Sequence, residues 1–347
     1  MGHGKNQDKN CVNEISRRTN LSKSTVSKAL NNCRAVNAQS KEAVVKAACE
    51  LHYTPPRAGR ILRRKNGAII GVAIPVNPCY FWNDAIRGMK AAEERHEGVQ
   101  LVFSLFANTL TERDALYCLE YLLNLQIELL IVTPPPFPSV WEKLREIAHA
   151  IPVVCFNETG EFPFLFYAGA DFYRDGIRLA RACAPALRDH PGLLSIVSSP
   201  MPMVRCRDEA FYHEAQALVP DLQRLGEVSI CSLDTASMSA QLARALHDKY
   251  DGRFRSVYVS QGFLPRVCLA LRKLSLLDSV VAFGYENPRQ TAAYIQRGTI
   301  AALVAQDTYE QGLRCVEAVF AYLDGGALPD GRQVLVPSRI CDLTAEG

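Results

Sequence analysis

Apolar runs and amphipathic segments alternate along most of the chain. Near-continuous apolar runs of strand length recur from residue 68 onward, at 68–75, 99–106, 129–134, 151–157, 164–171, 193–199, 228–234, 256–261, 279–286 and 301–307. Segments of helical periodicity separate them. Strands that are apolar on both faces and joined by helices belong to parallel sheets covered on both sides. Because this number of strands exceeds one compact sheet, the pattern predicts an α/β body of two doubly wound parallel-sheet subdomains.

The first part of the chain has a different pattern, which predicts three short helices at about 13–19, 23–31 and 38–51. A tight turn joins the first two helices, and Ser22 follows it as an N-cap whose hydroxyl can accept a hydrogen bond from a helix amide. The second helix has one apolar stripe and an outer face of short hydroxyls, amides and lysines. Such a pair indicates a helix-turn-helix, a small all-α domain that enters the DNA major groove. A solvated face on a small bundle is the alternative reading.

Charge divides the chain near the same position. Residues 1–66 carry 14 Lys and Arg against 4 Asp and Glu, a net charge of +10, whereas residues 67–347 carry 25 against 32, a net charge of −7. A basic head on an acidic body predicts that the head alone has an electrostatic partner, either nucleic acid or an anionic membrane. Since only Ile61 and Leu62 give residues 56–65 an apolar face, we expect no membrane partner.

Several sequence features place the protein in the cytoplasm. No apolar run is long enough for a membrane-spanning helix, and the first residues lack the apolar segment of a signal peptide. The 12 cysteines show no zinc-type spacing. We therefore expect buried free thiols in a reducing cytoplasm, without disulfides.

Two segments of the head carry a specific resemblance, LSKSTVSKALNN and VNAQSKEAVVKAACELHYTPPRAGRIL. They resemble the DNA-binding domain of the LacI/GalR family of transcription regulators, over about 55 residues without a gap. The resemblance implies base-reading and phosphate-contacting positions on the recognition helix, namely Lys23, Ser24 and Lys28 for bases, and Thr25, Ser27 and Asn31 for phosphates.

The basic segment that follows is similar to the hinge helix of the same family. The resemblance implies that Leu62 enters the minor groove, where an apolar wedge kinks the duplex. Arg57 and the neighbouring basic residues would then contact phosphates. Gly59 stands where the family usually has Ala, and Gly costs a helix about 1 kcal/mol relative to Ala. We therefore expect this hinge to fold less readily without DNA.

The body contains NPCYFWNDAIRGMKAA, VRCRDEAF, FGYENP and ALVAQDTYEQGLRCVEAVFAYLDGG. These segments resemble landmarks of the type I periplasmic-binding-protein fold, which forms the effector-binding body of the family. The resemblance implies a helix-turn-helix domain over 10–55, a hinge over 56–66, an N-subdomain over 67–160 and 305–325, and a C-subdomain over 161–304 and 326–344.

Ligands of open α/β sheets bind at the carboxyl ends of the strands. That rule selects polar residues at predicted strand ends, including Asn77, Asn157, Ser260, Glu286 and Gln306. The family resemblance adds Phe81, Trp82 and Arg207, and it implies aromatic stacking on a sugar ring and hydrogen bonds to its hydroxyls.

Five of these residues have a structural alternative. Phe81 and Trp82 also suit the core. Asn157 and Gln306 also suit strand capping. Arg207 also suits a surface ion pair with Asp208 or Glu209, and Ser260 stands where the family often has Asn.

The sequence lacks GxGxxG, GxxxxGK[ST], HExxH and GxSxG, so we expect no enzyme, cofactor or metal. The resemblance implies a repressor that binds double-stranded operator DNA as a homodimer and responds to a small-molecule effector, expected to be a carbohydrate. The alternatives are a non-sugar effector, either a nucleobase or a phosphorylated metabolite, and a solute-binding protein.

Overall fold

The computed structural model describes residues 13–30, 40, 43–44, 47, 68–76, 79–96, 98–106, 111–197, 201–230, 235–250, 254–285 and 288–343. The chain divides into two compact units. One consists of Met1–Pro75, Lys90–Val154 and Phe162–Leu165, and the other of Val76–Met89, Cys155–Glu161 and Phe166–Gly347.

The described part of the head is helical, as the sequence predicts. A first helix covers 13–19, Asn20 has a positive φ of 53°, and α2 spans Lys23–Leu30. Residues 40, 43, 44 and 47 are also helical, and the remainder of the predicted third helix lies outside the described residues. Apolar residues of these three segments are buried, namely Ile15, Val26, Ala29, Val44 and Ala47.

The first sheet has six strands in the order β11-β5-β4-β3-β1-β2. Their bounds are β1 Ala68–Pro75, β2 Val99–Phe106, β3 Leu129–Val132, β4 Val153–Phe156, β5 Tyr167–Gly169 and β11 Gln333–Leu335. β1 pairs in parallel with β2 and β3, and β5 pairs in parallel with β4 and β11. Helices α5 Cys79–Glu93, α6 Glu112–Asn124 and α7 Pro138–Ala150 follow β1, β2 and β3, and α13 Thr308–Leu323 packs against β5 and β11.

The second sheet also has six strands, in the order β12-β10-β9-β8-β6-β7. Their bounds are β6 Gly192–Val197, β7 Gln223–Ser229, β8 Ser256–Val259, β9 Val281–Tyr285, β10 Ile300–Ala305 and β12 Arg339–Asp342. β12 is antiparallel to β10, and the other pairings are parallel. The accompanying helices are α8 Phe172–Asp189, α9 Pro202–Leu218, α10 Thr235–Tyr250, α11 Leu264–Lys273 and α12 Pro288–Gln296, and a short 3-10 helix covers Asp330–Arg332.

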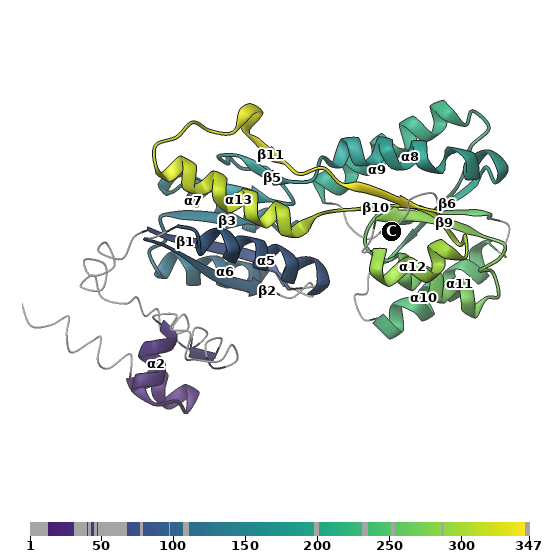
Figure 1. The fold of residues 1–347 in the computed structure, drawn as a ribbon. Coiled ribbons are helices and arrows are strands. Elements are labelled where there is room, and N and C mark those ends of the chain that lie inside the picture. The colour runs from purple at the N-terminus through teal and green to yellow at the C-terminus, as the bar shows by residue number, and fades with distance from the viewer. Residues whose placement is uncertain are drawn as a thin grey trace, which may run out of the picture. The chain divides into compact units, whose positions relative to one another are not determined.

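The second sheet packs apolar side chains on both of its faces. Successive side chains of a strand point to opposite faces, and neighbouring residues of its buried strands are apolar. On β6, Leu193 packs in a core that includes Phe211 of α9, whereas Leu194 packs in a core that includes Leu242 of α10. Figure 1 shows α8 and α9 along one face and α10, α11 and α12 along the other. The predicted class, two parallel-sheet α/β subdomains, is confirmed.

Strand pairing places β5 and β11 in the first sheet, although both lie beyond the predicted N-subdomain segments 67–160 and 305–325. The sheets and the compact units divide the chain at different residues. The predicted subdomain boundaries therefore stay a prediction.

Glycines allow α5 and α13 to approach closely. A Cβ atom added to Gly88 would lie 1.9 Å from the carbonyl oxygen of Tyr309, and one added to Gly312 would lie 2.1 Å from that of Ala85. Both distances are far below van der Waals contact, so neither position accepts a larger residue without a shift of backbone.

The described cysteines are free thiols, and four of them are buried: Cys155, Cys183, Cys268 and Cys315. Burial raises the pKa of each of these four thiols. Cys79 is exposed.

Across the described ranges we find no helix with the length and apolar character to span a membrane, and no group of three or more His, Cys, Asp or Glu that suits a metal ion.

Candidate functional site

The predicted recognition helix begins with a side-chain cap. The backbone N–H of Thr25 donates to Ser22 Oγ over 3.1 Å, and the two hydroxyl oxygens lie 2.8 Å apart. Lys23 and Ser24 are exposed, whereas Val26 on the opposite face is fully buried. The cap therefore supports a helix whose polar side is accessible.

The remaining predicted DNA contacts are only partly described. Ser27 and Lys28 belong to α2, but their side chains lie outside the description. Asn31, Arg57 and Leu62 lie outside the described residues altogether. Their roles stay predictions.

Two predicted ligand residues meet at strand ends in the second compact unit. Asn157, directly after β4, donates from Nδ2 to Gln306 Oε1 over 3.2 Å and to Gln311 Oε1 over 2.9 Å. Gln311 on α13 is fully buried, and its Nε2 donates to Gln306 Oε1 over 3.1 Å. These bonds connect β4, β10 and α13 through three amides. Gln311 was not predicted from the sequence.

Arg207 on α9 is buried, with 3% of its surface exposed. It donates from a terminal nitrogen to the carbonyl oxygen of Ser260. Its Cζ lies 3.4 Å from the ring centroid of Tyr285 and 4.7 Å from that of Phe172, which are cation–π distances. The surface ion pair with Asp208 or Glu209 is not among the ion pairs of the described residues.

Three buried polar atoms at this contact lack a hydrogen-bond partner among the described residues. They are Arg207 Nε, Ser260 Oγ and the hydroxyl oxygen of Tyr285, and Ser260 is 1% exposed. An unsatisfied buried polar group costs about 1–3 kcal/mol, so native proteins rarely retain one without a reason. A bound polar molecule would supply the missing partners.

Glu158 is another buried polar residue of this region, and the sequence did not predict it. It is 3% exposed, and its Oε1 accepts from the backbone N–H of Thr159 over 2.9 Å and of Met203 over 2.8 Å. Burial raises the pKa of this carboxyl to about 7, against the opposing effects of the two hydrogen bonds and of Arg207 and Arg205. Glu158 therefore titrates near neutral pH.

Two further carboxyls experience the charge of Arg207. Asp175 on α8 accepts from Ser338 Oγ over 2.6 Å, and Asp208 on α9 accepts from the hydroxyl of Tyr258 over 2.5 Å. Burial raises the pKa of each to about 6, although Arg207 acts to lower both values. Arg207 thus acts on all three carboxyls, and Arg178 on α8 also forms an ion pair with Asp175 over 3.7 Å.

The predicted aromatic pair divides between core and surface. Trp82 is 6% exposed and contacts Phe81 and Phe156 edge-on, with ring centroids 4.9 Å and 6.2 Å away. Phe81 is partly exposed. Asn77 and Glu286 lie outside the described residues. Trp82 is therefore built into the core, and Phe81 remains a candidate contact for a ligand.

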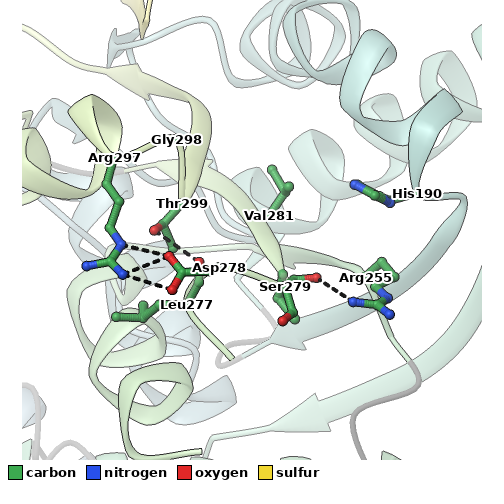
Figure 2. Close-up of a pocket in the computed structure, with 10 residues that line it drawn as sticks. His190, Arg255, Leu277, Asp278, Ser279, Val281, Arg297, Gly298 and Thr299 are labelled. Atoms are coloured by element: carbon green, nitrogen blue, oxygen red, sulfur yellow. Dashed lines mark hydrogen bonds and ion pairs between the residues drawn. The ribbon is translucent and has the colours of Figure 1, made fainter. Parts of the chain in front are cut away.

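A separate pocket of about 240 Å³ lies at the amino ends of β8, β9 and β10 (Figure 2). Arg297 donates to both carboxylate oxygens of Asp278 over 2.7 Å and 2.9 Å, and Arg255 donates to the carbonyl oxygen of Ser279 over 3.2 Å. Ligands of open α/β sheets bind at the opposite, carboxyl ends of the strands. This pocket is therefore not the candidate site.

Comparisons with known proteins agree with this geometry. Residues 70–327 match the family described as periplasmic binding protein domain, and residues 12–56 match the family described as bacterial regulatory proteins, lacI family. Fold and site thus define a helix-turn-helix protein with a periplasmic-binding-protein-like body. The chain belongs to the LacI family of regulators.

The matching relatives are named for regulation. The NTD biosynthesis operon regulator NtdR of Bacillus subtilis is 28% identical, over 42% of this chain and 43% of that protein. Catabolite control protein B of the same organism is 27% identical, over 49% of this chain and 54% of that protein. The chain spans about half the length of these relatives.

Solved structures share the fold. GanP, a glucose-galactose binding protein from Geobacillus stearothermophilus, has a TM-score of 0.71 at 19% identity, over 80% of this chain and 98% of GanP. A lac repressor dimer bound to operator and an anti-inducer has a TM-score of 0.65 at 18% identity, over 94% of this chain and 96% of the repressor.

Proposed function

We propose that this protein is a transcription regulator, acting as a repressor, whose affinity for operator DNA is controlled by a small molecule. One observation carries the proposal: a single chain joins a capped, outward-facing polar helix in a basic head to a body with unsatisfied buried polar atoms. The first feature suits DNA, and the second suits a polar ligand.

The proposed partner of the head is double-stranded operator DNA. The net charge of +10 over residues 1–66 favours phosphates, and the exposed Lys23 and Ser24 suit hydrogen bonds to base edges. A single head reads one half-site, so we propose a homodimer on a palindromic operator, in the cytoplasm.

The proposed effector is a carbohydrate. A sugar offers hydroxyls that both donate and accept hydrogen bonds, and Arg207 Nε and Ser260 Oγ need such partners. The solved structure of GanP, a sugar-binding protein by its name, has the same fold, which is consistent with this choice. Effector binding alters operator affinity only if the effector prefers one of two conformations of the protein.

A gel-shift titration on the DNA upstream of its own gene tests the proposal, with and without a panel of sugars. We expect a complex that resists an excess of scrambled competitor DNA, and at least one sugar that changes its yield. Lys23→Glu should abolish the specific complex. The control Lys273→Glu makes the same charge change at an exposed site on α11 and should bind as the wild type does.

Two results would count against this function. Equal competition by specific and scrambled DNA would exclude a sequence-specific regulator. An operator complex that responds to nucleobases or sugar phosphates, but to no neutral or amino sugar, would replace the carbohydrate effector with one of those ligands.

A further inference from the structure

Three side-chain amides at the strand ends of the candidate site hold one another in place. Asn157 Nδ2 donates to Gln306 Oε1 over 3.2 Å and to Gln311 Oε1 over 2.9 Å, and Gln311 Nε2 donates to Gln306 Oε1 over 3.1 Å. Each pair of amides thus shares one hydrogen bond. If one amide turned over alone, two donors or two acceptors would come into contact, so the three orientations are coupled.

The three amides differ in how far they reach the surface. Gln311 lies inside α13 and is fully buried, whereas Asn157 keeps 9% of its surface exposed and Gln306 is partly exposed. Neither Asn157 Oδ1 nor Gln306 Nε2 has a hydrogen bond within the described residues, and neither atom is fully covered by protein. These two atoms are therefore open to a ligand, and Gln311 is not.

The backbone of Asn157 supports a role in binding. Its φ is 61°, in the left-handed region, where residues other than glycine are uncommon. Its backbone N–H donates to the carbonyl oxygen of Ala168 over 2.8 Å, so pairing with β5 holds this conformation. Backbone strain that the surrounding structure maintains in this way concentrates at functional sites. The side chain of Asn157 is thus held in one place by its backbone and by two hydrogen bonds.

We propose that Gln311 is a positioning residue of the effector site, which sets the amides of Asn157 and Gln306 so that the first offers an acceptor and the second a donor. The inference rests on the proposed function, because it describes how the same site holds its effector. Since the two amides are in direct contact, one small ligand reaches both. One hydroxyl of a sugar donates to Asn157 Oδ1, and another accepts from Gln306 Nε2.

Loss of the Gln311 amide would loosen both contact residues together. Asn157 Nδ2 would keep one of its two acceptors, and Gln306 Oε1 would keep one of its two donors. The two remaining amides could then turn over as a pair without a close-packed third amide that must turn with them. Part of the free protein would present a donor where the ligand needs an acceptor, and the apparent affinity would fall with the competent fraction.

The test compares the wild-type protein with Gln311→Met, which keeps a long unbranched side chain and removes the amide. Isothermal titrations on the full-length protein use glucose, galactose, mannose, ribose and myo-inositol, and the compound that binds most tightly is used with every variant. We expect Gln311→Met to weaken its binding by about tenfold, the equivalent of about one hydrogen bond. The control Gln296→Met makes the same change at an exposed position on α12 and should bind as the wild type does.

A double-mutant cycle separates positioning from general damage to the fold. Asn157→Gly removes the amide that Gln311 holds, and Gly adopts a positive φ without strain. If Gln311 acts through Asn157, Gln311→Met should cost little further affinity in the Asn157→Gly background. A second cycle with Gln306→Ala covers the other contact, and a melting curve of each protein records stability independently of binding.

The outcomes distinguish this inference from the proposed function. Binding by Gln311→Met as tight as that of the wild type, or losses that add fully in both cycles, would overturn the positioning role of Gln311 and leave a sugar effector standing. If none of the five compounds binds the wild-type protein, the carbohydrate effector itself is contradicted, and the assignment of sugar hydroxyls to Asn157 and Gln306 falls with it.

Discussion

The guanidinium of Arg207 lies 3.4 Å from the ring centroid of Tyr285, and both side chains are buried. Tyr285 is the last residue of β9, so this stacking fixes a cation of α9 at the carboxyl end of a strand. Since one terminal nitrogen also binds the carbonyl oxygen of Ser260, the orientation of the guanidinium is set before any ligand arrives. Preorganisation of this kind reduces the entropy that binding costs.

Replacement of Arg207 by Lys should therefore weaken the response to the effector. Lys keeps a positive charge but lacks the planar fork and its Nε–H, so it cannot stack and donate together. We expect effector affinity to fall by at least about tenfold, which corresponds to the loss of about one charged hydrogen bond. Titration calorimetry measures the loss, with Arg205→Lys, an exposed neighbour on α9, as the control. Unchanged affinity in Arg207→Lys would remove this residue from the site.

Loss of the Ser22 cap should weaken operator binding through the stability of α2. The hydroxyl accepts from the Thr25 amide, and removal of an N-cap costs about 0.5–2 kcal/mol. Ser22→Ala should lower operator affinity, and Ser22→Asp, which can also cap, should largely restore it. Fluorescence anisotropy on operator DNA compares the three proteins. If Ser22→Asp binds no better than Ser22→Ala, the hydroxyl acts in some other way.

The raised pKa values of Glu158, Asp175 and Asp208 predict the pH dependence of stability. Their ordinary values are 4.5 for Glu and 3.8 for Asp, and in the folded protein they are about 7, 6 and 6. The folded state thus binds more protons than the unfolded state between these values, so the free energy of unfolding falls as pH rises from about 4 to 7. Glu158→Gln should make this decline shallower in urea titrations, most clearly between pH 5 and 7. A decline as steep as that of the control Glu209→Gln, an exposed position on α9, would show that Glu158 does not titrate in this range.

The close packing of α5 against α13 predicts that larger residues at the contact lower the stability of the fold. Gly312→Ala places a methyl group against the carbonyl oxygen of Ala85, and overpacking costs about 1–3 kcal/mol or more. We expect a lower melting temperature for Gly312→Ala and for Gly88→Ala. The comparison variant is Gly192→Ala, whose added Cβ would meet the flexible end of Leu225 at 3.3 Å and should be milder. Equal melting temperatures for all three would contradict this view of the helix contact.

Local signals made much of the fold predictable. The Ser22 cap and the apolar stripe of α2 lie within a few residues of each other, and the buried strands of both sheets are continuous apolar runs. The apolar pattern did not give the correct bounds of β7. The sequence pattern favoured 228–234, but the strand is Gln223–Ser229, because an edge strand of polar, exposed residues needs no apolar run. β11 and β12 were not predicted, since they have three and four residues and none of these residues is buried.

The candidate site was predictable only where a strand end marks it. Asn157 and Gln306 follow apolar runs, so their place at the carboxyl edge could be inferred. Gln311 lies inside a helix and meets Asn157 across 154 positions of the chain, a contact that no local pattern encodes. Glu158 follows Asn157 directly, yet its burial depends on α9, whose Met203 supplies a backbone N–H. The available signal was an acidic residue directly after the apolar run and its Asn157.

Operator affinity with and without the sugar that binds most tightly tests the central claim most directly, by anisotropy on the upstream DNA fragment. A regulator of this kind should show a change of about 5- to 150-fold at saturating sugar, the usual range of allosteric coupling. At the sugar concentration that just saturates the wild-type protein, Arg207→Lys should keep the operator affinity of the unliganded protein and show a smaller change. Equal operator affinity with and without saturating sugar would contradict the account.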